Sequence, residues 1–455
     1  MDKVKLGIVI TARDTFPPRN YALENARRIR ERLRGIFEAM PYVQPIWTDQ
    51  LLGDGMATPL KEAEMVSEYF KSQKADAVFV PHANFGQEET VGIIADNLRL
   101  PVLIWGPRDG SPDPDAPFRQ TDTQCGMFAT TRLLLRYGLP YTYLRNCWLD
   151  SSELEKGIDD FIRVASIVKA FRRLRVMQLS TRPRQFLSVK VNEGELLERF
   201  GIHVVPIESV EIVSRIDGFI AERTASKKLV SEWKEQGILF RGASESELIT
   251  IAAIVLAILS MAEQYRCSAV ASECWSLLRA HYQVSGCFAF GYLSQLGLPV
   301  CCENDIHGAI SSVLAQAVSL YRTPSFLADI TVRHPQNDNA ELLWHCGPFP
   351  PTLAKREAFV EKGQGQYQLK DGGLTLIRFD ADHQTYSLFA EECQTTDGPA
   401  TTGNYVWIET KDWGRWEDKL MYGPYIHHIA GVYGSYKDVL REACKYLGVS
   451  FDCVF

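Results

Sequence analysis

The order of strands and helices expected over the first 320 residues is the feature that most constrains the fold. Short apolar runs at 5–11 (KLGIVIT), 75–81 (ADAVFVP) and 100–105 (LPVLIW) are expected to be buried strands, and apolar residues recur at helical spacing in 21–37. Strands and helices in this alternation are typical of a parallel sheet with helices on both faces. In such sheets, ligands gather at the carboxyl ends of the strands.

A helical stretch at 151–173 separates this series from a second one of the same kind. Its expected strands, and the long apolar helix between them, lie at 175–179, 201–207, 245–265 (the helix), 268–271 and 299–302. This second series predicts another α/β unit.

From about Tyr321 the pattern changes to strand-like runs divided by Gly, Pro and Asp turns, with one final helix at 436–447. The fold class is therefore expected to be α/β, with two doubly wound parallel-sheet domains followed by a mostly antiparallel β domain. Their expected limits are 1–172, 173–320 and 321–455.

Composition excludes several functions. The net charge of −7 over 455 residues repels nucleic acid and anionic membranes, so neither partner is expected. The N-terminus lacks the apolar stretch of a signal peptide. The most apolar segment, 248–262, is shorter than the roughly 20 residues of a membrane span and is expected to be a buried core helix. Eleven cysteines without a CxxC pair fit reduced thiols. We expect a cytoplasmic protein.

The segment 302–308 (CENDIHG) follows an apolar strand and carries two carboxylates, Glu303 and Asp305. Mg²⁺ and Mn²⁺ prefer such oxygen ligands, so a metal site is one interpretation. The alternative is a helix N-cap, because Asn and Asp are common ahead of a helix and stabilise it by about 1 kcal/mol.

A second segment, 425–429 (YIHHI), lies in a glycine-rich stretch near the C-terminus. Adjacent histidines on a strand point to opposite faces, so at most one of His427 and His428 is expected to enter a shared site. A lone histidine is more often a core or surface residue than a ligand.

Together these segments resemble the L-fucose isomerase family, including its shorter relatives and, more distantly, L-arabinose isomerase. PVCCENDIHGA resembles the family's strand–TEND–helix motif, whose aspartate binds the metal; that residue is Asp305 here. HHIAGVYG is similar to the C-terminal motif in which the metal histidine lies six residues before a glycine, which gives His428, with His427 as a substrate contact. FLADI at 326–330 and WHCG at 344–347 resemble further family segments.

The resemblance implies a Mn²⁺-dependent enzyme, or one that uses another divalent ion such as Mg²⁺ or Co²⁺, that isomerises a pentose, deoxyhexose or modified sugar. It also implies homo-oligomers, trimers or hexamers. Aldose–ketose isomerisation moves a proton between C1 and C2 through a cis-enediol, so it needs a base and an electrophile. A divalent ion supplies the electrophile and a carboxylate the base.

The longer family members carry a glutamate some two dozen residues before the metal aspartate, acting as ligand and base. Counting back from Asp305 reaches a segment without a carboxylate, where the shorter relatives' CW…C pattern is matched by Cys274, Trp275 and Cys287. We expect Glu273 to be this ligand and base, and Glu303 is its competitor.

Several residues are candidate substrate contacts. In the first domain they lie in strand-end loops, and later in the chain they lie in the family-like segments and a tryptophan-rich stretch: Arg13, Arg19, Asn84, His345, Cys346, His427 and Trp407. Core packing is the competing interpretation for His345, Cys346 and the tryptophans. Another metal-assisted sugar reaction (epimerisation or carbon–carbon cleavage) and a non-catalytic sugar-binding protein remain alternative functions.

Overall fold

A computed structural model describes residues 3–15, 19–58, 60–112, 114–115 and 120–455. The chain divides into two compact units, residues 1–169 and 170–455. The second unit contains both the second parallel sheet and the antiparallel strands that follow it.

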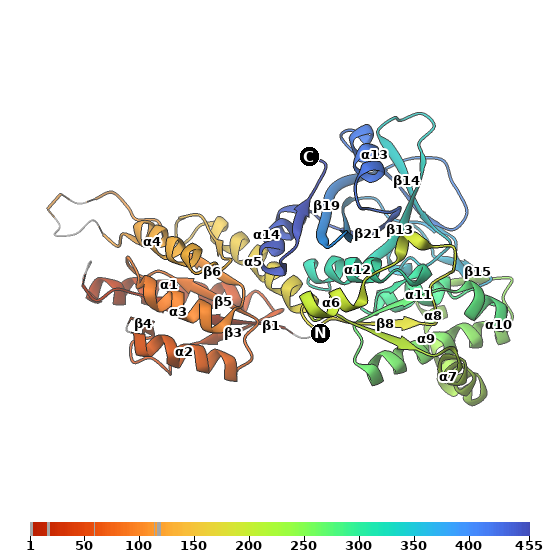
Figure 1. Cartoon of the computed structure of the whole chain (residues 1–455), viewed down its shortest axis with the longest axis horizontal. Coiled ribbons are helices and arrows are strands. Elements are labelled where there is room, and N and C mark those ends of the chain that lie inside the picture. Colours follow the sequence, from red (N-terminus) through yellow and green to blue (C-terminus); the bar gives the residue numbers. More distant parts are fainter. Residues whose placement is uncertain (1–2, 16–18, 59, 113, 116–119) are drawn as a thin grey trace. The chain divides into compact units, whose positions relative to one another are not determined.

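The first unit is built on a five-stranded parallel sheet in the order β3-β1-β5-β6-β7. Helices α2, α3 and α4 pack side by side, and Arg32 of α1 forms an ion pair with Glu155 of α5. Figure 1 shows this unit in red to yellow. Its elements are β1 (Val4–Ile8), β2 (Ile10–Thr11), α1 (Arg19–Glu38), β3 (Val43–Trp47), β4 (Met56–Ala57), α2 (Leu60–Ser72), β5 (Ala77–Pro81), α3 (Glu88–Leu98), β6 (Val102–Trp105), α4 (Thr123–Arg136), β7 (Thr142–Tyr143) and α5 (Ser152–Phe171).

The second unit begins with a four-stranded parallel sheet in the order β12-β11-β8-β9. Its helices and strands are β8 (Arg175–Leu179), α6 (Glu193–Phe200), β9 (His203–Ile207), α7 (Ser209–Glu222), α8 (Thr224–Glu235), β10 (Leu239–Arg241), α9 (Glu245–Tyr265), β11 (Ala269–Ser272), α10 (Ala280–Tyr282), α11 (Cys287–Gln295), β12 (Val300–Cys301) and α12 (Ile306–Val318). Short helical turns at 187–189, 275–279 and 302–304 connect them.

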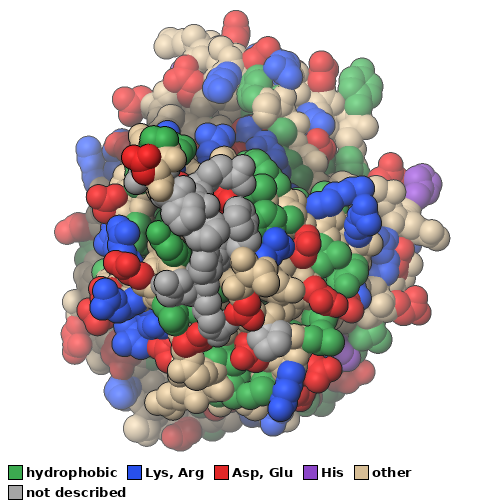
Figure 2. Space-filling view, turned by 90° about the vertical axis from the view of Figure 1, so that its left-hand side faces the viewer, with side chains coloured by type: hydrophobic (Ala, Val, Ile, Leu, Met, Phe, Trp, Pro, Cys, Tyr) green, Lys and Arg blue, Asp and Glu red, His purple; other side chains and the backbone are tan. Residues whose placement is uncertain are grey.

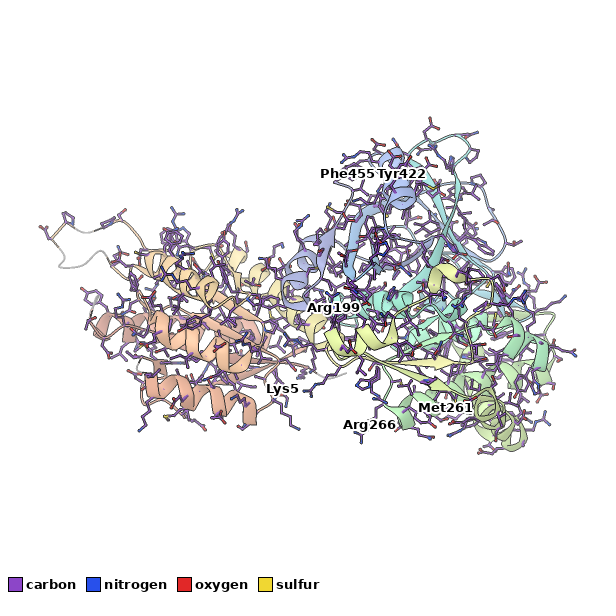
Figure 3. All side chains as sticks on the ribbon, in the orientation of Figure 1. Lys5, Arg199, Met261, Arg266, Tyr422 and Phe455 are labelled. Atoms are coloured by element: carbon purple, nitrogen blue, oxygen red, sulfur yellow. The ribbon has the colours of Figure 1, made fainter. Side chains whose placement is uncertain are left out.

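Helix α9 is the central helix of this layer. It packs against α7, α8 and α11, and most of its apolar side chains from Leu248 to Ala262 lie in one apolar cluster of the unit. Figure 3 labels Met261 and Arg266 at its C-terminal end. By length and composition α9 is the one helix of the described residues that could cross a membrane, but 61% of its apolar window is buried inside the protein. This agrees with the expected core helix.

Eight of the remaining strands form a mostly antiparallel sheet in the order β17-β20-β14-β13-β21-β18-β19-β22. The other two, β15 and β16, form a separate three-stranded sheet with β10. An additional pairing between β19 and β20 closes six strands of the larger sheet into a barrel. The elements are β13 (Phe326–Arg333), β14 (Ala340–His345), β15 (Phe359–Glu361), β16 (Gln364–Gly365), β17 (Tyr367–Gln368), β18 (Gly373–Asp382), β19 (Thr385–Thr396), β20 (Asn404–Glu409), α13 (Trp413–Tyr422), β21 (His428–Tyr433), α14 (Lys437–Leu447) and β22 (Ser450–Asp452), with a helical turn at 351–353.

Helix α12 joins the two layers of the second unit. It packs against β11 and β12 of the parallel sheet and against β18 and β21 of the barrel, and every residue from Ile306 to Val318 is buried. Figure 1 shows α12 between these two parts. The predicted fold class is thus confirmed: two parallel α/β sheets precede a mostly antiparallel sheet.

Candidate metal centre

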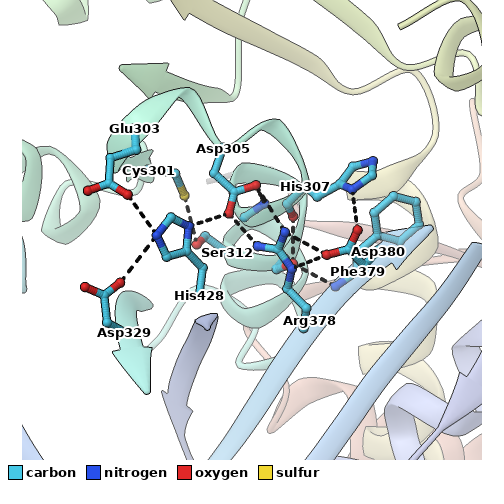
Figure 4. Close-up of polar contacts among 12 residues, drawn as sticks. Cys301, Glu303, Asp305, His307, Ser312, Asp329, Arg378, Phe379, Asp380 and His428 are labelled. Carbon is cyan, nitrogen blue, oxygen red and sulfur yellow. Dashed lines mark hydrogen bonds and ion pairs between the residues drawn. The ribbon is translucent and has the colours of Figure 1, made fainter. Parts of the chain in front are cut away.

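The imidazole of His428 is the centre of a buried polar cluster. Its Nδ1 lies 2.9 Å from Asp305 Oδ2, and its Nε2 lies 3.0 Å from Glu303 Oε2 and 3.4 Å from Asp329 Oδ1. Figure 4 shows Glu303 and Asp329 approaching one edge of the ring and Asp305 the other. The structure therefore brings together the two sequence segments that carry Asp305 and His428, as the sequence predicts.

Local backbone geometry places the two carboxylates of the CENDIHG segment. Glu303 and Asn304 have left-handed φ angles of 63° and 55°, which side-chain-bearing residues rarely adopt. Asp305 then begins α12 as its N-cap, because its Oδ1 accepts the Gly308 N–H at 2.9 Å. A Cβ at position 308 would lie 2.5 Å from Asp305 Oδ2, so glycine is required there. The N-cap interpretation of Asp305 is correct.

Asp305 is also paired with a buried arginine. Arg378 of β18 donates to both Asp305 oxygens, at 2.5 and 3.2 Å, and its Nε donates to Asp380 Oδ2 at 2.8 Å. Asp380 Oδ1 in turn lies 2.9 Å from His307 Nδ1. Because Asp305 is fully buried and its oxygens are occupied by these donors, it holds His428 in place and has no free edge for a ligand.

These contacts shift the protonation of the cluster. Burial opposes a charge on Asp305, but Arg378 and His428 outweigh it and hold the pKa of Asp305 well below its usual range. Burial lowers the pKa of His428, yet hydrogen bonds to Asp305 and Glu303 overcome this and raise it to about 9. Glu303 keeps a lowered pKa because contacts with His428 outweigh its burial. The carboxylates are therefore ionised at neutral pH.

Two carboxylate oxygens approach Nε2 of the His428 ring: Glu303 Oε2 at 3.0 Å and Asp329 Oδ1 at 3.4 Å. Asp329 Oδ1 lies at ion-pair distance from His428 but is buried without a hydrogen-bond partner among the described residues. The Nδ1 of His428 is held by Asp305, which is how proteins orient a metal-binding imidazole. Two carboxylates and one imidazole suit Mn²⁺ or Mg²⁺, so the donor set fits the expected ion.

Asp329 is the residue that the sequence analysis missed. It lies in the FLADI strand, which was singled out as family-like without a role for its aspartate. Position 329 lies 26 residues after position 303 (329 − 303), close to the two dozen residues expected between the family's glutamate and aspartate. Reading the spacing forward from Glu303, instead of back from Asp305, would have found this pair.

His427 lies at the exposed rim of the cluster. One ligand atom from each of Glu303, His427 and His428 lies within 4.8 Å of the others. Both histidines thus approach Glu303, contrary to the expectation that only one enters the site. The reason is that β21 begins at His428, so strand alternation does not apply to His427. The ring of His427 lies 6.4 Å from that of Phe186.

Glu273 has a different place from the one expected. It follows β11 and is buried, and its carboxylate accepts hydrogen bonds from the backbone N–H groups of Trp275, Ser276 and Leu277, at 2.8 to 3.2 Å. It also accepts the hydroxyl of Ser276. These bonds cap the helical turn at 275–279, so Glu303 takes the position in the cluster that was expected for Glu273.

His345 lies beside the same cluster. Its Nδ1 accepts the Cys346 N–H at 2.9 Å, so the neutral ring carries its proton on Nε2, which is 3.9 Å from Asp329 Oδ1. This Nε2 is buried without a hydrogen-bond partner among the described residues. His345 therefore offers a donor to a bound oxygen. Cys346 Sγ lies 3.2 Å from Cys287 Sγ, behind His345.

The C-terminal tryptophans lie in the core of the barrel unit. Trp407 is 3% exposed and its indole N–H donates to Pro399 O at 2.8 Å, so it presents no free face to a sugar. Trp413 and Trp416 are buried and stacked on each other, with ring centroids 5.8 Å apart. The expected sugar-stacking role of Trp407 is replaced by packing.

The first-domain candidates lie together at the carboxyl ends of β2 and β5. The Arg13 N–H donates to Asn84 Oδ1 at 2.8 Å, Asn84 Nδ2 donates to Arg13 O at 2.9 Å, and the Arg13 guanidinium lies over the Phe85 ring at 3.9 Å. The side chain of Arg19 lies outside the described part of the structure. Acidic and basic side chains are interspersed over the face shown in Figure 2.

Comparison with known proteins identifies relatives of the chain. Residues 7–172 match the family model described as fucose/sulfoquinovose isomerase, N-terminal domain. A sulfoquinovose isomerase of Alkalicoccus urumqiensis is 24% identical over 338 residues, covering 72% of this chain and 74% of the relative. A sulfoquinovose isomerase of Priestia aryabhattai is 22% identical over 411 residues, covering 87% and 89%.

Among solved structures, a periplasmic solute-binding protein from Actinobacillus succinogenes 130z with bound D-allose is 11% identical and covers 65% of this chain and 83% of that protein. Its TM-score is 0.18, so this likeness supports no conclusion about fold or ligand.

Proposed function

We propose that the chain is a metal-dependent aldose–ketose isomerase of the fucose isomerase-like family. Its residues 7–172 match the N-terminal domain model of that family, and sulfoquinovose isomerases are 24% and 22% identical to it. The observation that carries this proposal is the approach of the Glu303 and Asp329 carboxylates to Nε2 of His428, at 3.0 and 3.4 Å. Such a donor set holds a divalent ion, and Mn²⁺ is the proposed one. When bound, the ion would supply the electrophile that stabilises negative charge on the sugar oxygens during proton transfer.

The carboxylates have separate tasks in this proposal. Asp305 is fully buried, whereas the side chains of Glu303 and Asp329 are 11% and 18% exposed and can reach a substrate. Glu303 has the longer side chain and a lowered pKa, so it is an ionised base able to move the proton between C1 and C2. His345 Nε2–H and the rim residue His427 are placed to bind sugar hydroxyls.

The proposed substrate is sulfoquinovose or a closely related sugar. Relatives that align with 72% and 87% of this chain are sulfoquinovose isomerases, and the matching family description names fucose as well. Homo-oligomerisation and a cytoplasmic location remain predictions. In this proposal Glu303 and Asp329 act as the two carboxylates of the family site, which favours isomerisation over the alternatives of epimerisation and carbon–carbon cleavage.

The test is an isomerase assay of the purified protein with Mn²⁺, using sulfoquinovose and L-fucose in parallel and following aldose-to-ketose conversion. In ²H₂O, the proposed proton transfer introduces deuterium at the carbon next to the carbonyl. Glu303→Gln is expected to lower kcat by about 100-fold or more, since a general base typically contributes 10²–10⁴-fold. Asp338→Asn, an exposed loop change, is the matched control. Retention of full kcat by Glu303→Gln would remove Glu303 as the base.

A further inference from the structure

Two cysteines lie in van der Waals contact beside the candidate metal centre. Cys287, the first residue of α11, is fully buried, and Cys346, which directly follows β14, is half-buried. Their Sγ atoms are 3.2 Å apart although 59 residues separate them in the chain. A disulfide has an S–S distance of about 2.05 Å, so the two sulfurs must come about 1 Å closer to form the bond.

The pair belongs to a larger group of thiols. Cys274 interacts with Cys287, and Cys302 lies close enough to Cys274, Cys287 and Cys346 for all three to raise its pKa, after burial as the main cause. Cys302 directly precedes Glu303. A thiol close to a second thiol can react in a way that an isolated buried cysteine cannot. When one of the two sulfurs is oxidised to a sulfenic acid, the neighbouring thiol can react with it to form a disulfide.

The thiol pair is connected to the site through His345. The Cys346 N–H donates to His345 Nδ1 at 2.9 Å, and Cys346 Sγ lies 3.3 Å from the same nitrogen. The opposite nitrogen of this ring faces Asp329 at 3.9 Å. The backbone beyond Cys346 is tightly packed, because the position of a Cβ on Gly347 is 2.4 Å from the Gly365 nitrogen. A movement of Cys346 towards Cys287 is therefore passed on to His345.

We infer that Cys287 and Cys346 form an oxidisable dithiol that closes to a disulfide and disturbs the candidate metal centre. A peroxide is the oxidant: the more exposed Cys346 sulfur attacks it, giving a sulfenic acid and water (or an alcohol from an organic peroxide). Cys287 then displaces a second water to form the S–S bond. Two thiols are oxidised by two electrons and one peroxide is reduced, so the step balances. A dithiol reductant reverses it.

The test combines protein chemistry with a metal-binding readout. The wild-type chain is treated with hydrogen peroxide, then with an alkylating reagent, and analysed by intact mass and peptide mapping. A peptide pair linking Cys287 to Cys346 is expected, with Mn²⁺ affinity reduced several-fold and restored by dithiothreitol. For each of the variants Cys346→Ser and Cys287→Ser, the Mn²⁺ affinity is measured before and after peroxide treatment. Peroxide is expected to leave the Mn²⁺ affinity of both variants unchanged. Cys125→Ser, at an exposed position, is the control and behaves as the wild type.

Two outcomes would overturn the inference. In the first, both thiols remain fully alkylatable after peroxide treatment under conditions that oxidise Cys125. In the second, the disulfide forms but Mn²⁺ affinity is unchanged. The effect on the site rests on the proposed metal function, but disulfide formation does not. Absence of Mn²⁺ binding in the untreated, reduced protein would therefore refute the proposed function and not the dithiol.

Discussion

Asp329 and His428 are direct partners in the antiparallel β13–β21 ladder, and their side chains meet on the same side of the sheet with Oδ1 and Nε2 3.4 Å apart. Two of the three proposed donors are thus fixed by one pair of hydrogen-bonded strands. The third, Glu303, comes from the turn before α12, which packs against β21. A site built on regular elements in this way holds its donors in place before any ion arrives.

Replacing Asp329 by asparagine tests the donor set. Asp329→Asn replaces the carboxylate that lies 3.4 Å from His428 Nε2 by a neutral amide. Mn²⁺ affinity is therefore expected to fall by at least about 10- to 100-fold, the loss typical even of residues that only orient a metal ligand. Isothermal titration with Mn²⁺ measures this directly. Asp338→Asn removes one carboxylate from an exposed loop and should leave the affinity at the wild-type value. Equal affinities for the two variants would exclude Asp329 as a ligand.

Arg378 is expected to be required for stability. It is fully buried between Asp305 and Asp380, and breaking a buried pair by removing one partner typically costs about 3–5 kcal/mol. We expect Arg378→Met to lower the free energy of unfolding by about this amount in a urea titration. The double variant Arg378→Met with Asp305→Asn should recover part of the loss, because a neutral amide then replaces the unpaired carboxylate. A single variant as stable as the wild type would contradict this.

Replacing Glu273 by glutamine tests whether its carboxylate has a structural role or binds the metal. Its oxygens accept three backbone N–H groups of one helical turn. Glu273→Gln is therefore expected to lower the unfolding free energy by about 1–2 kcal/mol, since hydrogen bonds to charged groups are worth about this much or more. Its Mn²⁺ affinity should match that of the wild type. A loss of affinity as large as that of Asp329→Asn would restore Glu273 as a ligand.

The buried carboxyl group of Glu341 is expected to make the stability of the protein depend on pH. Burial in β14 raises its pKa from 4.5 to about 7, and Oε2 has no hydrogen-bond partner among the described residues. The folded state therefore binds this proton more tightly than the unfolded state, and stability falls as pH rises from about 4.5 through 7. Glu341→Gln should be more stable than the wild type at pH 8, by about 1–2 kcal/mol, and little different at pH 4.5. Thermal unfolding at both pH values measures the difference in stability between the two proteins, and a difference that is the same at pH 4.5 and pH 8 would refute the prediction.

Much of the fold followed from local pattern. The long apolar helix was expected at 245–265 and α9 spans the same residues, because its capping Ser244 and its apolar run are both readable in sequence. The change to strand-like runs expected from about Tyr321 agrees with β13, which begins at Phe326. The closure of the barrel through β19 and β20 was not predictable, because it depends on pairing between strands and not on the pattern within one.

The site was predictable only in part, for the same reason. Asp305 and His428 were found because each lies in a distinctive segment. Their separate roles were not, because the partner that occupies Asp305 is Arg378, 73 residues away in an ordinary-looking strand. The spacing between Glu303 and Asp329 is close to the spacing expected between the family's glutamate and aspartate. It was missed because Asp305 was taken as the family's aspartate. Glu273 was expected to be the ligand and base because it follows a strand. A carboxylate at that position can equally well cap the helical turn that comes next.

The contact between Glu303 and His428 joins side chains 125 positions apart in the chain. During synthesis the acidic turn therefore leaves the ribosome long before β21 is made. Until then the acidic turn and its arginine-bound neighbour are without the imidazole that lies between them. A chain without β21 would keep Glu303, Asp305 and Asp329 but lose the imidazole that contacts all three.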